Sequence, residues 1–190
     1  MITGLLLAAG GARRFGRQKL VATLDGIPLV VHAANALSRV TDGLVIVIGH
    51  EADAVRAALV DIEATIVENG DWSTGLASSV RCGVAAAPAG TEAIVIALGD
   101  QPDIDSGIVA RLIERWRETG RPIVAAKYRG QRGHPVLFER SMFAGLARLT
   151  GDVGARDLID QSPDAVAYVE VRAPVPPDID TPSDLDGFHR

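Results

Sequence analysis

The chain has 190 residues, a mass of 19.9 kDa and a formal net charge of −5, which suits one substantial core and is short for two domains. The acidic balance argues against nonspecific nucleic-acid binding, and a single cysteine excludes an intramolecular disulfide and a multi-cysteine metal site. We expect one cytoplasmic domain over residues 1–190, and no membrane partner because the apolar N-terminal run is far shorter than the roughly 20 residues that span a bilayer.

Apolar runs and amphipathic segments alternate along the first two thirds of the chain. Residues 2–8 are typical of a strand, and 28–40 place apolar side chains on one helical face with proline in the first turn. Further strands are expected at 44–49, 64–68, 93–100 and 121–128, and further helices at 52–60, 75–87 and 105–118. The strands lack polar alternation, as in a parallel sheet covered on both faces. This predicts a three-layer α/β fold with a doubly wound, mostly parallel sheet.

The pattern changes after about Tyr128. Residues 128–138, YRGQRGHPVLF, are typical of a turn between two short extended segments, and two brief helices and a strand around 165–171 follow. We expect this C-terminal third to add a small antiparallel edge to the sheet. It would also place a lid over the carboxyl ends of the strands, where open α/β sheets bind ligands.

The first strand breaks directly into GGARRFGRQK, residues 10–19. The spacing fits neither a P-loop, since Arg17 and Gln18 follow the second glycine, nor the G-x-G-x-x-G fingerprint. Glycines at a strand exit let backbone N–H groups approach a polyphosphate, and nearby cations add positive charge. Those cations are Arg13, Arg14, Arg17 and Lys19. The alternative is a solvated surface loop, but its place directly after an apolar strand favours phosphate binding.

Two acidic positions are candidates for holding a hard cation. The strand of AIVIALGDQPDI delivers Asp100 to its carboxyl end, where a carboxylate suits magnesium. In PDIDTPSDL, Asp180 is a candidate second ligand, although an Asp-Thr-Pro sequence is equally typical of a helix start. The alternative role for Asp100 is to cap the following turn. His134, in the RGHPV turn, lies near the expected substrate side, and the residues alone leave its contact with substrate open.

Six segments in this order carry a resemblance to a known family: LAAGGARRFGRQK, NGDWSTGLASSVRCG, LGDQPDI, RGHPVLF, GDVGARDL and DIDTPSDL. Together they resemble the MobA-like nucleotidyltransferases, and most closely the molybdenum cofactor cytidylyltransferase branch. The resemblance covers nearly the entire chain. It implies a Rossmann-like fold of the GT-A nucleotidyltransferase type, which transfers a nucleoside monophosphate from a triphosphate to a phosphorylated acceptor and releases pyrophosphate.

The resemblance also assigns roles to individual residues. The family's nucleotide-binding signature is matched by Leu7, Ala8, Ala9, Gly10, Arg14, Phe15, Gly16 and Lys19, whereas Ala12 replaces the usual serine. Nucleotide contacts are expected from Leu7, Ala8, Ala9, Gly10, Gly11, Arg14, Lys19, Gly75 and Ser79. Catalytic roles fall on Arg14, Lys19 and Asp100, Mg2+ ligands on Asp100 and Asp180, and substrate contacts on Gln101, Gly133 and His134.

The Ala-Ala-Gly at the strand exit resembles the cytidylyl rather than the guanylyl branch, which favours CTP. The acceptor would then be molybdenum-loaded molybdopterin, with transient contact to a molybdoenzyme or its chaperone. Four alternatives stay open: another phosphorylated acceptor, a GTP-using homologue, a MobA-like nicotinamide-dependent reductase, and a non-catalytic cofactor carrier.

Overall fold

The computed structural model describes residues 1–11, 15–152 and 155–188. Its strands are β1 (Ile2–Ala8), β2 (Thr23–Leu24), β3 (Ile27–Pro28), β4 (Gly43–Ile48), β5 (Thr65–Glu68), β6 (Ala93–Leu98), β7 (Ile123–Tyr128), β8 (Gln131–Glu139) and β9 (Val166–Val171). Its α-helices are α1 (Leu29–Ser38), α2 (Ala52–Ala58), α3 (Leu76–Ala86), α4 (Ser106–Thr119), α5 (Phe143–Leu146), α6 (Arg156–Gln161) and α7 (Pro182–Asp186). The expected elements are all present, with ends that differ by a few residues.

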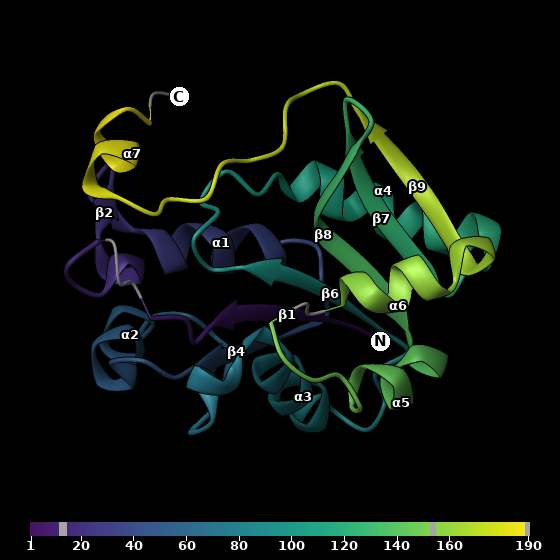
Figure 1. Ribbon diagram of the computed structural model, residues 1–190, viewed down its shortest axis with the longest axis horizontal. Coiled ribbons are helices and arrows are strands. Elements are labelled where there is room, and N and C mark those ends of the chain that lie inside the picture. Colours follow the sequence, from purple (N-terminus) through teal and green to yellow (C-terminus); the bar gives the residue numbers. More distant parts are fainter. Residues whose placement is uncertain (12–14, 153–154, 189–190) are drawn as a thin grey trace.

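The described residues form a seven-stranded sheet in the order β5-β4-β1-β6-β8-β7-β9 (Figure 1). Strands β5, β4, β1 and β6 pair in parallel, and so do β7 and β9. The antiparallel strand is β8, which pairs with both β6 and β7. The expected α/β fold with a mostly parallel sheet is confirmed. The antiparallel pairing belongs to the C-terminal third as expected, but β8 is enclosed by its neighbours, and the edge strand β9 runs parallel to β7.

Helices cover both faces of this sheet because successive residues of each strand point to opposite sides. Along β1, Leu6 and Ala8 join the core beneath α1, α2 and α4, whereas Leu5 and Leu7 join the core beneath α3, α5 and α6. Helix α4 shows the local logic well. Asp105 caps its first turn by accepting a hydrogen bond from the Gly107 N–H group at 2.7 Å, and its apolar stripe lies on the sheet.

A small two-stranded ribbon, β2-β3, precedes α1 and was not expected from the sequence. Pro28 was expected in the first turn of a helix. It is instead the last residue of β3 and the residue directly before α1. The C-terminal segment crosses from β9 to this ribbon and ends in α7 beside β2 (Figure 1). Its Ile179 is fully buried there in a third apolar cluster with Phe15, Leu24 and Leu29. The tail is therefore anchored to the loop that follows β1.

No helix among the described residues is both long enough and apolar enough to cross a membrane.

Candidate functional site

The carboxyl ends of β1 and β6 meet side by side and begin the site. Leu7 of β1 is in register with Leu98 of β6, and the Gly99 N–H group donates to the Leu7 carbonyl at 2.9 Å. The chain leaving β1 at Ala8 and the chain leaving β6 before Asp100 therefore emerge together. This is the edge at which open α/β sheets bind ligands.

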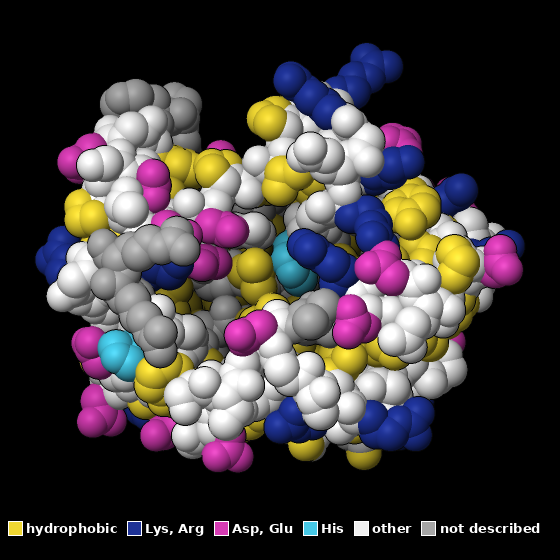
Figure 2. Space-filling model, viewed as in Figure 1, with side chains coloured by type: hydrophobic (Ala, Val, Ile, Leu, Met, Phe, Trp, Pro, Cys, Tyr) yellow, Lys and Arg dark blue, Asp and Glu magenta, His cyan; other side chains and the backbone are white. Residues whose placement is uncertain are grey.

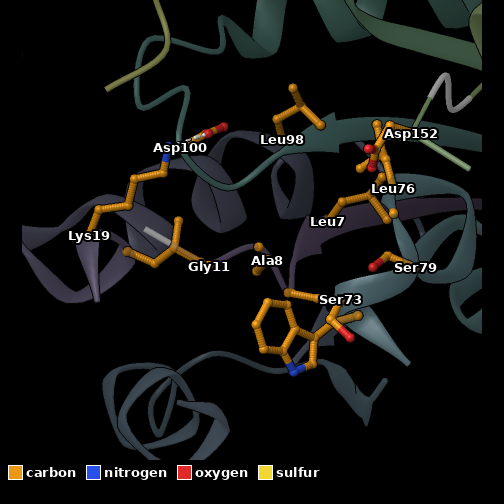
Figure 3. Close-up of a pocket in the computed structure, with 15 residues that line it drawn as sticks. Leu7, Ala8, Gly11, Lys19, Ser73, Leu76, Ser79, Leu98, Asp100 and Asp152 are labelled. Carbon is orange, nitrogen blue, oxygen red and sulfur yellow. Dashed lines mark ion pairs between the residues drawn. The ribbon is translucent and has the colours of Figure 1, made fainter. Parts of the chain in front are cut away.

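A cavity of about 400 Å3 opens at this edge (Figure 3). It falls within the roughly 300–1,000 Å3 of typical ligand sites. Lys19 and Asp100 lie at one end of it, and Ser79 and Asp152 at the other. Its lining consists of Leu7, Ala8, Ala9, Gly10, Gly11, Lys19, Leu20, Trp72, Ser73, Gly75, Leu76, Ser79, Leu98, Asp100 and Asp152. On the surface, acidic side chains gather in the central hollow of this face, with Lys and Arg side chains along one margin (Figure 2).

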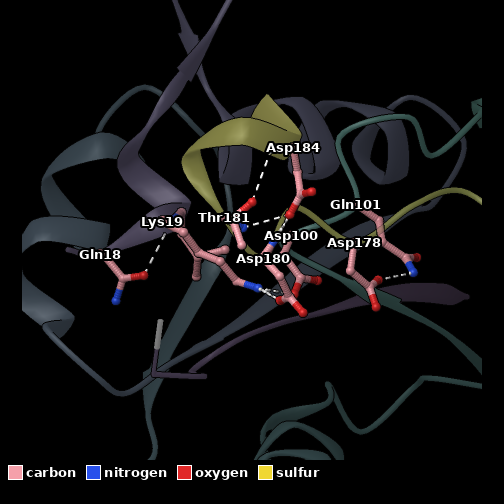
Figure 4. Close-up of polar contacts among 9 residues, drawn as sticks. Gln18, Lys19, Asp100, Gln101, Asp178, Asp180, Thr181 and Asp184 are labelled. Carbon is pink, nitrogen blue, oxygen red and sulfur yellow. Dashed lines mark hydrogen bonds and ion pairs between the residues drawn. The ribbon is translucent and has the colours of Figure 1, made fainter. Parts of the chain in front are cut away.

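At the charged end, the Lys19 ammonium bridges two carboxylates from distant parts of the chain (Figure 4). Its Nζ lies 2.8 Å from Oδ2 of Asp100 and 2.8 Å from Oδ1 of Asp180. Burial by itself would lower the pKa of Lys19. The charges of Asp100 and Asp180 and the hydrogen bonds to them outweigh burial and raise the pKa above its ordinary value, so the side chain stays an ammonium.

The position of Asp180 follows from the anchored tail. Ile179 is fully buried, and its N–H group donates to the Asp100 carbonyl at 3.1 Å. On either side of it, Asp178 accepts a hydrogen bond from Gln101 at 2.7 Å and Asp180 accepts one from Lys19. Thr181 then starts α7 with a reciprocal capping box to Asp184. The alternative reading of DIDTP as a helix start is therefore also met, with Thr181 as the cap.

The two aspartates fit a divalent cation. Each places one carboxylate oxygen on the same ammonium nitrogen, so the two oxygens are separated by no more than twice 2.8 Å. The ammonium stands in for a cation held between them, and carboxylate oxygens are the ligands that Mg2+ and Mn2+ prefer. Magnesium on a nucleotide commonly uses only one or two protein carboxylates. Asp100 and Asp180 would hold the ion.

The opposite end of the cavity is built by the turn before α3. Asn69 is buried and donates through Nδ2 to the hydroxyls of Ser78 at 2.8 Å and Ser79 at 3.0 Å, while its Oδ1 accepts from the Asp71 N–H group. These bonds hold the first turn of α3 against the end of β5. Gly75, before the helix, has φ 116° and ψ 168°, a backbone conformation open essentially to glycine alone.

Trp72 lines the cavity and was not among the expected site residues. A side chain at Gly49 would place Cβ 2.8 Å from the Trp72 Cβ, and one at Gly11 would lie 3.1 Å from its ring. His50 contacts the indole edge-on with the ring centroids 4.9 Å apart. Two glycines thus make room for the indole, and an aromatic wall faces the loop after β1.

The expected acceptor-side residues lie outside the cavity lining. Gln101 is 4% exposed, and its Oε1 atom has no hydrogen-bond partner among the described residues. Gly133 lies against Tyr128, whose ring would contact a side chain there at 3.1 Å. His134 bonds through Nδ1 to the Ile96 carbonyl at 3.4 Å. Because a carbonyl only accepts, Nδ1 carries the proton.

Burial lowers the pKa of His134, opposed by the Ile96 carbonyl and the charges of Asp100 and Asp178, and aided by Arg156. The unfolded chain therefore binds a proton at this position more readily than the folded one, and folding stability falls as pH falls through the ordinary value of 6.5. We expect His134→Gln to flatten this part of the dependence of unfolding free energy on pH, measured by urea denaturation from pH 8 to 5. If the unfolding free energy of His134→Gln depended on pH in the same way as that of wild type, His134 would not be the source of this dependence.

Most predicted nucleotide contacts meet in this one cavity. The expected residues that line it are Leu7, Ala8, Ala9, Gly10, Gly11, Lys19, Gly75, Ser79 and Asp100. Arg14 and Ala12 lie outside the described residues. Phe15 is buried under the tail, and Arg17 lies 5.9 Å above its ring. Asn69, Trp72, Ser73 and Asp152 were missed, although they fall in or beside segments that carry the resemblance.

Comparison with known proteins places this architecture. The family model for the MobA-like NTP transferase domain matches residues 4–166. The nicotine blue oxidoreductase of Paenarthrobacter nicotinovorans is 36% identical over 181 residues, which cover 89% of this chain and 86% of that protein.

Solved structures agree over almost the entire chain. Rv0371c from Mycobacterium tuberculosis H37Rv is 30% identical with a TM-score of 0.86, covering 98% of this chain and 95% of that one. The same protein in complex with manganese gives a TM-score of 0.84, covering 98% and 96% of the two chains. CMP:2-keto-3-deoxy-manno-octonic acid synthetase with CTP, at 13% identity, 98% and 95% coverage and a TM-score of 0.78, shares the fold. With its strand exits, cavity and motif order, the chain belongs to the MobA-like NTP transferase family.

Proposed function

We propose that this protein is a divalent-metal-dependent nucleotidyltransferase that transfers CMP from CTP to molybdenum-loaded molybdopterin and releases pyrophosphate. The observation that carries the proposal is the charged end of the cavity, where Lys19 and Asp100 from two neighbouring strand exits are joined by Asp180 from the tail. A site for a metal-bound polyphosphate needs these groups together.

The reaction needs no protein nucleophile because the acceptor is already an anion. A terminal phosphate oxygen of molybdopterin attacks the α-phosphorus of the nucleotide, and the bond to the pyrophosphate oxygen breaks. The protein has to bring two polyanions together and stabilise charge on the leaving group. A divalent cation held by Asp100 and Asp180 would neutralise phosphate charge.

The described residues suit these tasks. Lys19 is a point charge on a flexible stem and would bind the phosphates, and Gly10 and Gly11, which line the same cavity, would add backbone N–H contacts. Ser79 and Gly75, at the far end of the cavity, would contact the nucleoside. Arg14, in the same loop, would add a bidentate phosphate contact.

Two similar proteins support the proposed use of a divalent cation and of CTP. Rv0371c has been solved with manganese, which favours a divalent cation in a related site. A fold neighbour has been solved with CTP, and the Ala8-Ala9-Gly10 exit resembles the cytidylyl branch.

We test the proposal by supplying CTP, GTP, ATP and UTP in turn with Mg2+ and molybdenum-loaded molybdopterin. Pyrophosphate release and a dinucleotide product with CTP are expected. A protein that shows no turnover with any of the four nucleotides would contradict the proposed transferase function.

The nicotine blue oxidoreductase relative favours a second candidate, a reductase that uses a nicotinamide cofactor on the same sheet. The absence of the dinucleotide fingerprint in the loop after β1 speaks against it. An assay of nicotinamide absorbance with nicotine blue as substrate distinguishes the two. Oxidation of the nicotinamide cofactor without pyrophosphate release from CTP would establish the reductase.

A further inference from the structure

We propose that Lys19 occupies the metal site of the nucleotide-free protein and so keeps a divalent cation from binding there. Its ammonium holds one oxygen of each of the two carboxylates that would bind a divalent cation, so the cation enters together with the triphosphate, whose phosphates bind the ammonium in their place. This inference rests on the proposed function for the identity of the ligand. The competition between Lys19 and the metal follows from the contacts of this chain alone.

The geometry makes the two cations exclusive. Lys19 Nζ is 2.8 Å from an oxygen of each aspartate, and only 11% of its side chain is exposed. An ion on those oxygens would lie within a few ångströms of the ammonium, and by Coulomb's law like charges at such a distance in a partly buried site repel each other strongly. Lys19 must therefore move before a divalent ion can be held.

A second position, inside the cavity, is open to the Lys19 side chain. It lines the cavity as well as contacting the aspartates. Its backbone is held in the short 3-10 helix Lys19–Val21, which Gln18 caps, and Gln18 is itself anchored by donating to the His50 carbonyl at 2.7 Å. The four-carbon side chain can therefore swing while its backbone stays fixed. Rotation toward the cavity would place the ammonium on a bound polyphosphate.

The exchange couples the metal to the nucleotide. A triphosphate that draws Lys19 away frees the two carboxylates, and a cation on the carboxylates frees Lys19, so each ligand strengthens the other by the same factor. Free metal alone has to displace the ammonium without any phosphate to receive it. We therefore expect weak binding of free Mn2+ to the wild-type protein.

The test uses Mn2+ and the full chain without nucleotide. Lys19→Met keeps the length and apolar stem of the side chain and removes the cation that Asp100 and Asp180 share. We expect Mn2+ binding, followed by electron paramagnetic resonance of the free ion, to tighten by ~10-fold or more. We also expect Lys19→Met to unfold at a lower temperature than wild type in chelator and to regain much of the difference in Mn2+.

Two controls sharpen the result. Lys127→Met removes another lysine that is ion-paired, with Glu170 at 3.5 Å, but lies outside the cavity lining, and it should leave Mn2+ affinity unchanged. The double variant Lys19→Met with Asp180→Asn should lose the gain in affinity, because the freed site then lacks one carboxylate. Where Lys19→Met does not yield folded protein, Lys19→Gln is measured in its place with the same outcomes expected.

Equal Mn2+ affinity in wild type and the Lys19 variant would overturn the proposal, as would a gain that Lys127→Met or the double variant reproduces. These titrations contain neither nucleotide nor acceptor, so their failure leaves the transferase assay unaffected. Conversely, a chain that shows the expected Mn2+ competition but transfers no nucleotide would overturn the proposed function alone.

Discussion

Asp100→Asn is expected to lower kcat/KM for nucleotidyl transfer by ~10²–10³, the usual cost of losing one preorganised charge at a reacting phosphate. The amide keeps the size of the side chain and removes its charge, so it weakens both the ion pair to Lys19 and the hold on a divalent cation. Pyrophosphate release from CTP with saturating acceptor is the measurement. The same loss is expected of Lys19→Ala, and of Arg14→Ala, a residue outside the described part of the chain.

Asp105→Asn is the matched control for Asp100→Asn. It lies five residues further on in the same loop and accepts a hydrogen bond from the Gly107 N–H group as the cap of α4. Asparagine is as good a cap as aspartate, so neither stability nor turnover should change appreciably. Near wild-type turnover in Asp100→Asn and Lys19→Ala, with both proteins folded, would show that the charged end of the cavity does not serve the reaction.

Gly75→Ala is expected to destabilise the fold by about 1–3 kcal/mol from backbone strain alone, because alanine rarely adopts its φ of 116°. Packing adds to this cost. An added Cβ would lie 2.6 Å from the carbonyl carbon and oxygen of Gly151 and 2.6 Å from a carboxylate oxygen of Asp152. Backbone has to move to relieve such contacts. The Gly151 carbonyl also accepts a hydrogen bond from the Ala77 N–H group in the first turn of α3, so the shift would reach the cavity lining.

Urea denaturation measures this loss, and nucleotide titration of the folded variant measures its effect on the cavity. Gly70→Ala is the control, since Gly70 precedes the same turn, is exposed and has open space around its Cβ position. It should match wild type in both measurements. Equal stability of the Gly75 and Gly70 variants would mean that the turn before α3 adapts more freely than its conformation indicates.

Local pattern was sufficient for most of the fold. Most of the long strands, such as β1, β4 and β6, are runs of mainly apolar residues between polar turns, and each long helix carries an apolar stripe, so both could be predicted over their own length. The β2-β3 ribbon could not, because two-residue strands show no periodicity. The enclosed place of β8 could not either, since sheet order is set by which long-range pairings bury the most surface.

The residues of the site also fall into those that the sequence could predict and those that it could not. Residues that follow directly from a strand end, such as Gly10, Gly11 and Asp100, could be predicted because parallel neighbours bring their carboxyl ends to one edge. Trp72 had no local signal as a cavity wall. Its position depends on the glycine at 49, which is distant in sequence and whose missing side chain leaves room for the indole.

The amino-acid sequence by itself determined the alternation of strands and helices, the glycines and cations after β1 and the acid after β6, because each depends on neighbouring residues. Only the tertiary structure decided that Lys19 joins Asp180, which lies 161 residues away. That contact depends on Ile179 being buried among Phe15, Leu24 and Leu29, and a buried site assembled from three separate segments leaves no periodic trace in any one of them.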